Sequence, residues 1–351
     1  MHARRLSALL ALVAAVGVPR SVAAESRILQ RVVVAGQPAP GGGVFERFSI
    51  EVLPVVAPVN SHGHVAFFAT ILRGRTSEGY FRATGRRIDT IAAQGDAAPG
   101  GGTFSGFGRH PIPALNEAGD VAFEAAVSGG KTVEGIFATT GRRLRAVAVV
   151  GGAAPGIASG TFANLDAPAL NDRGDVAFLA TVRRGRETVE AIYLSSGATL
   201  SKIVAQGDPA PAGGAFAGFG VPALNAAGAV AFAAVVEGRA VPGGVFVASA
   251  GRVRMLVGAG DETPIGGIFA KFSERVALNG AGAVAFTAAL KEAPIAQAVF
   301  VAYDGERERP LVRLEDVGRR IGRAVVGHQQ VIFPREDRED LSYLPEDQSD
   351  R

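Results

Sequence analysis

Three aspartates, Asp96, Asp208 and Asp261, stand at equivalent places in glycine-rich loops, each directly after a glycine and three residues before a proline. Gln94 and Gln206 stand two residues before the first two of them. Carboxylate and amide oxygens that converge can bind a hard cation, and paired carboxylates can serve as general acid and base. Either chemistry requires a fold that brings these loops together.

Arginines on other predicted turns, Arg73 and Arg184, would lie on the same face of such a fold as the aspartate loops. These seven side chains are the candidate ligand-binding residues. A simpler interpretation is favoured: aspartates in glycine-rich turns bond to nearby backbone, and arginines on loops are solvated charges.

A second candidate is the pair His62 and His64, because two imidazoles two residues apart can share a metal ion. Spacing fixes no acidic partner for them, so surface histidines are favoured and no metal site is predicted. The glycine runs lack the Lys-Ser/Thr of a phosphate loop, and no Ser-His-Asp arrangement is recognisable. We therefore predict neither catalytic residues nor a cofactor.

The elements that would position these residues come from one phrase, Asn-x-x-Gly-x-Val-Ala-Phe, which occurs five times at intervals of 56, 55, 54 and 54 residues. Such regular intervals indicate one supersecondary unit copied along the chain. The signature asparagines and glycines suit a hairpin turn with a glycine at positive φ, so they are predicted to be structural. They are Asn60, Gly63, Asn116, Gly119, Asn171, Gly174, Asn225, Gly228, Asn279 and Gly282.

Residues 94–150 represent one repeat. A short strand ends at Asn116, and three further strands follow, separated by turns at 116–119, 128–131 and 141–143. No window is long and periodic enough for a helix. Phenylalanines recur at fixed places in each repeat, which predicts an aromatic core between adjacent units.

Four-stranded units of this length predict an all-β fold, a β-propeller. Residues 28–36 look like a last strand without the three before it, and residues 321–333 look like a worn first and second strand. Pairing these two ends would complete a sixth blade and remove exposed strand edges. Six blades are therefore expected, with five blades or an open array as the alternatives.

The ends of the sequence predict export. Arg4 and Arg5 precede an apolar run that is too short to span a bilayer, followed by small residues suited to cleavage. We expect a signal peptide at 1–24, a repeat domain at 25–335, an acidic disordered tail at 336–351, and no membrane span after cleavage. The mature chain would be periplasmic or extracellular.

Charge and cysteine content narrow the possible partners. The chain has 36 basic and 33 acidic residues, and loss of three arginines with the signal leaves these numbers equal. A balanced charge argues against nucleic acid as a partner. Cysteine is absent, so disulfides and thiolate metal sites are excluded.

The five octets, together with the Gly-Asp-x-x-Pro loops, resemble the NxxGxxAF tandem-repeat family of exported bacterial proteins. The resemblance covers residues 28–334. It implies export and repetition, and often a C-terminal sorting anchor, whereas this chain carries an acidic segment at that end. The family has no settled activity, so the resemblance adds no site residues.

Three functions remain open. A non-enzymatic binding or scaffold protein, monomeric and with an unknown protein or glycan ligand, is favoured because rigid blades with variable loops suit recognition. A hydrolase or lyase of an extracellular polymer is the alternative, with carboxylates from the acidic loops. A purely structural role at the cell surface is the third.

Overall fold

Short segments rich in alanine, valine and phenylalanine, separated by glycine turns, form antiparallel strands throughout the described part of the chain. The computed structural model describes residues 31–50, 53–54, 57–107, 112–238 and 242–303. Within these ranges no helix is present, and hence none that is long and apolar enough to cross a membrane.

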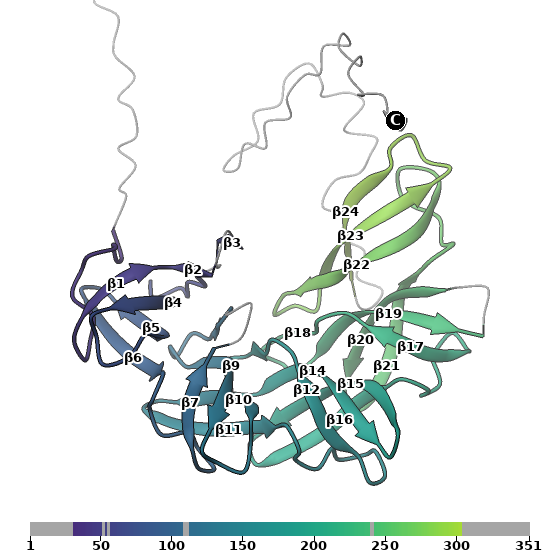
Figure 1. The fold of residues 1–351 in the computed structure, drawn as a ribbon. Helices are drawn as coiled ribbons and strands as arrows, with labels where there is room; N and C mark the ends of the chain where they lie inside the picture. Colours follow the sequence, from purple (N-terminus) through teal and green to yellow (C-terminus); the bar gives the residue numbers. More distant parts are fainter. Residues whose placement is uncertain (1–30, 51–52, 55–56, 108–111, 239–241, 304–351) are drawn as a thin grey trace, which may run out of the picture. The chain divides into compact units, whose positions relative to one another are not determined.

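In the described residues five sheets of three or more strands follow one another along the chain, and we call them blades 1 to 5 (Figure 1). Blade 1 contains β1 (Val44–Arg47), β4 (Val65–Leu72), β5 (Glu78–Thr84) and β6 (Arg87–Ala93), and blade 2 contains β7 (Thr103–Gly106), β8 (Ala114–Leu115), β9 (Val121–Ser128), β10 (Glu134–Thr140) and β11 (Arg143–Val149). Blade 3 contains β12 (Thr161–Leu165), β13 (Ala169–Leu170), β14 (Val176–Arg184), β15 (Glu187–Ser196) and β16 (Thr199–Ala205).

Blade 4 contains β17 (Ala215–Phe219), β18 (Ala223–Leu224), β19 (Val230–Glu237), β20 (Gly243–Ser249) and β21 (Arg252–Gly258), and blade 5 contains β22 (Ile268–Leu278), β23 (Val284–Lys291) and β24 (Gln297–Ala302). A separate pair consists of β2 (Ser49–Ile50) and β3 (Leu53–Pro54). The predicted all-β fold of propeller-like, four-stranded blades is confirmed.

The first strand of blades 2, 3 and 4 is interrupted, which the sequence did not predict. In blade 2, β7 pairs with the end of β9 and β8 pairs with its beginning. Pro113, Pro168 and Pro222 stand directly before the second segments, and proline has no N–H for a sheet ladder. In blade 5 Val276 takes this position and β22 is continuous, although its pairing with β23 shifts register between Phe272 and Val276.

Neighbouring blades share their apolar cores. Tyr80 of blade 1 packs against Phe107 and Phe123 of blade 2, with ring centroids 5.1 and 4.9 Å apart. Similar mixed clusters join blades 2 and 3, 3 and 4, and 4 and 5. The small alanines beside the aromatics let the sheets approach closely, so the blades stabilise one another through buried apolar surface.

The signature asparagines link the blades in a hydrogen-bonded ladder. Each Nδ2 donates to the backbone oxygen of the asparagine in the next blade: Asn60 to Asn116 at 3.0 Å, Asn116 to Asn171 at 3.1 Å, Asn171 to Asn225 at 3.0 Å and Asn225 to Asn279 at 3.2 Å. Each Oδ1 accepts from backbone N–H groups of its own turn. Each of these side chains therefore holds a hairpin, and the first four also join two blades.

The signature glycines serve the same turns. Gly63, Gly119, Gly174, Gly228 and Gly282 all have φ between 74° and 88°, a conformation that side chains with a Cβ rarely adopt. At Gly174 an added Cβ would meet nothing within 4 Å, so glycine is required there by backbone conformation rather than by space.

Several predictions from the two ends of the chain fall outside the described residues. They are the signal peptide at 1–24, the acidic tail at 336–351, the segment 321–333, and part of the segment 28–36. The sixth blade that these ends would complete stays a prediction.

Candidate functional site

The three loop aspartates are each bonded within their own loop. The Oδ2 atoms of Asp96, Asp208 and Asp261 accept from the backbone N–H three residues earlier, at 2.8, 2.8 and 2.7 Å. Each carboxylate thereby closes the turn that leaves the last strand of a blade. The equivalent places recognised in the sequence thus share a structural task.

Three of the other predicted ligand-binding residues also have local partners. Gln94 donates to the backbone oxygen of Ser105 at 3.1 Å, and Gln206 accepts from the Glu190 N–H at 3.4 Å. Arg184 pairs with Glu187 at 3.0 Å, and both are exposed. Arg73 is an exposed turn residue with a φ of 59°.

Asp208 has a cation beside it. Its Oδ2 lies 2.8 Å from Nζ of Lys202, which comes from the last strand of the same blade. This carboxylate is neutralised within its own blade.

The histidine pair belongs to the first signature turn. The rings of His62 and His64 lie 5.9 Å apart, and Nδ1 of His62 is 3.4 Å from the Glu117 carboxylate of the next blade. His64 contacts the Asn60 amide at 3.3 Å. Across the part of the chain that the structure describes, no group of three His, Asp or Glu residues is arranged to hold a metal ion.

A cavity lies instead where the first strands of the blades depart from regular pairing. Its volume is about 520 Å³. Ile112 of blade 2, Asp166 of blade 3, Val221 of blade 4 and Arg275 of blade 5 all contribute to it from these irregular segments. Val221 and Arg275 also form a parallel bridge that joins two of the segments.

Four of the ten residues that line this cavity, which we call the acidic cavity, carry a carboxylate. Glu124 is on β9 and Glu134 begins β10, while Asp166 follows β12 and Glu274 lies within β22. One arginine, Arg275, also lines the cavity. The arrangement is suited to a cationic group rather than to an anion.

Burial makes the charges in the cavity costly. Together with the smaller effects of the nearby carboxylates of Glu134 and Asp166, it raises the pKa of Glu124 to about 7. Burial also raises the pKa of Glu134, against the effect of a hydrogen bond from the Leu165 amide. Its Oε1 is buried without a hydrogen-bond partner among the described residues. These acids would be stabilised by a positive charge inside the cavity.

Comparison with known proteins places the chain in a family. Residues 15–304 match a family of unknown function, DUF7453. The chain belongs to the DUF7453 family. No protein of curated function matches it significantly.

The DUF7453 chain is also similar to the crystal structure of a protein of unknown function from Dyadobacter fermentans. The two share 11% sequence identity with a TM-score of 0.32, over 76% of this chain and 84% of that chain.

Sequence reasoning missed the acidic cavity of this DUF7453 protein because its acidic residues other than Glu134 do not recur. Asp166 follows Leu165 in blade 3 and Glu274 follows Phe272 in blade 5. Each precedes an Ala-Leu-Asn segment, in a stretch where the repeats differ. Glu124 lies next to a repeated Phe, in the part of β9 between the residues that pair with β7 and those that pair with β8. The signal that could have indicated this site is the presence of charged residues at positions that differ from repeat to repeat, close to the Pro-Ala-Leu-Asn segments.

Proposed function

We propose that this protein is an exported, non-catalytic binding protein whose acidic cavity holds a positively charged group of its ligand, an amine or a guanidinium. The observation that carries the proposal is the raised pKa of Glu124 in a cavity with further carboxylates. A buried carboxylate without a cation favours its protonated form, and an incoming cation makes ionisation favourable.

Binding of such a cation should release protons. With a pKa of about 7, Glu124 is about half-protonated at neutral pH, and a bound cation would lower that pKa. Calorimetry with spermidine at pH 7, in two buffers of different ionisation enthalpy, measures both the affinity and the protons released. We expect saturable binding with release of a fraction of a proton.

Glu124→Gln is expected to weaken spermidine binding about tenfold and to remove the proton release, because the amide cannot ionise. Glu187→Gln is the matched control, since Glu187 is exposed and lies outside the cavity. Spermidine binding that is absent, or that is equally strong in the Glu124→Gln and Glu187→Gln variants, would contradict the proposal.

Export is part of the same proposal and rests on the apolar run that follows Arg4 and Arg5. Expression of the full sequence in a bacterium should yield an exported chain that begins at Glu25. Mass spectrometry of the exported fraction checks this, and a chain that retains residues 1–24 in the cytoplasm would contradict it.

A second candidate function is a hydrolase or lyase of an extracellular polymer. It is favoured by one observation, that a carboxyl with a pKa of about 7 can donate a proton near neutral pH while Asp166 lies in the same cavity. Release of reducing ends from polysaccharides that is lost in Glu124→Gln would support this candidate. Spermidine binding without such release in the unaltered protein supports the binding protein.

A further inference from the structure

A glutamate links each of the first three blades to the blade that follows. Glu78, Glu134 and Glu190 occupy the same place near the start of the third strand of blades 1, 2 and 3. Their carboxylates accept from the backbone N–H groups of Phe107, Leu165 and Phe219 in the next blade. For Glu190 and Phe219 the distance is 3.1 Å.

Blade 4 lacks this link because Gly243 stands at the equivalent position. The amide that corresponds to Phe219 is that of Phe272 in blade 5. Phe219 pairs with Ala234 on β19, and Phe272 pairs with Ala288 at the equivalent place on β23. The backbone N–H groups of Phe219 and Phe272 therefore both point away from the strand with which each residue pairs. Phe272 therefore offers an N–H without the glutamate that the equivalent position supplies in blades 1 to 3.

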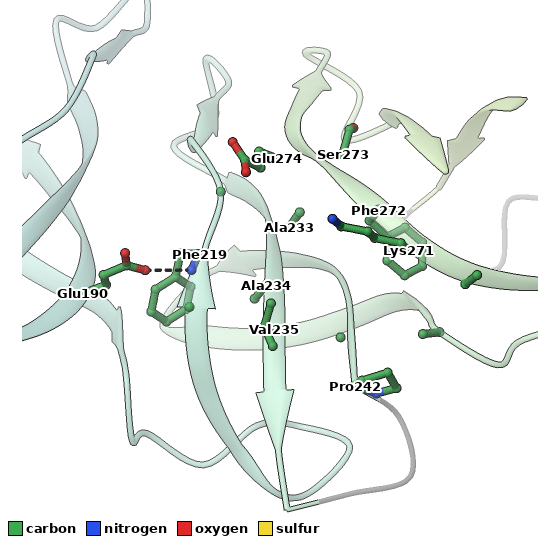
Figure 2. Close-up of a pocket in the computed structure, with 15 residues that line it drawn as sticks. Glu190, Phe219, Ala233, Ala234, Val235, Pro242, Lys271, Phe272, Ser273 and Glu274 are labelled. Atoms are coloured by element: carbon green, nitrogen blue, oxygen red, sulfur yellow. Dashed lines mark hydrogen bonds between the residues drawn. The ribbon is translucent and has the colours of Figure 1, made fainter. Parts of the chain in front are cut away.

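A cavity of about 470 Å³ lies at this place, and both Gly243 and Phe272 line it. Figure 2 shows Phe219, Val235 and Phe272 around it, with the ammonium of Lys271 directed toward the strand that carries Ala233. Val235 is 53% exposed. The cavity thus combines apolar walls with a cation and a backbone donor.

The two carboxylates in the lining do not take the place of the missing glutamate. Glu190 already accepts from the Phe219 amide, as the dashed line in Figure 2 shows. Glu274 lies at the end of the cavity opposite Pro242 in Figure 2, and it also lines the acidic cavity.

We infer that this cavity binds an organic carboxylate with an apolar body. The carboxylate accepts from the Phe272 amide, as the glutamates do in the other blades, and pairs with Lys271, while the apolar body packs against Phe272 and Val235. Hydrogen bonds to an ionised group are the stronger class of hydrogen bond, so the carboxylate determines specificity. The inference does not depend on a cation in the acidic cavity.

The probe is 4-phenylbutanoate, with 4-phenylbutanol as the uncharged control, and the measurement is calorimetry on the mature protein. The carboxylate is expected to bind at least about tenfold more tightly than the alcohol. Equal binding of the two probes, or no binding of the carboxylate, overturns the inference.

Two variants locate the site. Lys271→Gln should weaken binding of 4-phenylbutanoate about tenfold and leave 4-phenylbutanol unchanged. Val235→Trp should fill the cavity and block both probes, whereas the control Val133→Trp, at a position that is 65% exposed, should not. Undiminished binding to Val235→Trp would place the probe elsewhere and overturn the inference.

Restoring the glutamate is not a usable test, because a Cβ at Gly243 would lie 2.6 Å from the backbone oxygen of Ala234. Glu124→Gln separates this inference from the proposed function. That variant should bind spermidine about tenfold more weakly and keep its affinity for 4-phenylbutanoate, so either site can fail independently of the other.

Discussion

Replacement of Asn171 by alanine is expected to lower the free energy of unfolding by about 3 kcal/mol. Its Oδ1 accepts from the N–H groups of Arg173 and Asp175 at 3.0 and 2.9 Å, and its Nδ2 donates to Asn225 O at 3.0 Å. The residue is only 4% exposed. Alanine would leave these buried groups without partners, and such groups are more costly than a lost surface hydrogen bond.

Asn279→Ala is the matched control. Asn279 holds its own turn, with Oδ1 bonded to the N–H groups of Ala281 and Ala283, but it is exposed and is the last asparagine of the ladder in the described residues. Its loss should cost about 1 kcal/mol. Urea denaturation of both variants measures the difference, and equal losses would show that the link between blades contributes nothing.

Replacement of Glu124 by glutamine is expected to stabilise the protein at pH 8 by about 2 kcal/mol, after a reduction for screening by solvent. The folded protein holds the Glu124 proton up to a pKa of about 7, whereas the unfolded chain releases it near 4.5. Between these values the folded state binds more protons, so stability falls as pH rises. Glutamine carries no charge, so this loss is absent from the variant.

The unfolding free energies of the unaltered protein and of Glu124→Gln should therefore coincide near pH 4, and the difference between them should grow up to pH 8. Urea denaturation at several pH values checks this. Glu187→Gln, at an exposed position, should follow the unaltered protein throughout. A Glu124→Gln curve parallel to that of the unaltered protein would mean that this carboxyl ionises normally in the fold.

Much of the fold could be predicted because it depends on residues that recur. The hairpin turn needs an asparagine and a glycine at set positions, and the sheets need aromatic residues facing small alanines, so both appear as columns in the sequence. The ladder between blades could not be read in the same way. The Nδ2 of Asn116 reaches the next blade only because packing brings two turns 55 residues apart within hydrogen-bond distance.

The candidate site was harder to predict for the same reason. Asp96, Asp208 and Asp261 were chosen because they recur at equivalent loop positions. Residues that recur in a repeat protein are mainly structural, and each of these aspartates closes a turn. Glu124 and Asp166 come together only because proline interrupts the first strands and the irregular segments differ between blades. A local break in pairing, rather than a motif, creates the cavity.

The central claim is that the acidic cavity binds a cation, and the ionisation of Glu124 tests it most directly. Carbon-detected NMR can follow the Glu124 carboxyl through a pH titration of the mature protein, without and with saturating spermidine. The predicted midpoint is about 7 without spermidine, and it should fall by about one unit or more when spermidine is bound. A midpoint near 4.5, or one that spermidine does not move, would contradict the claim.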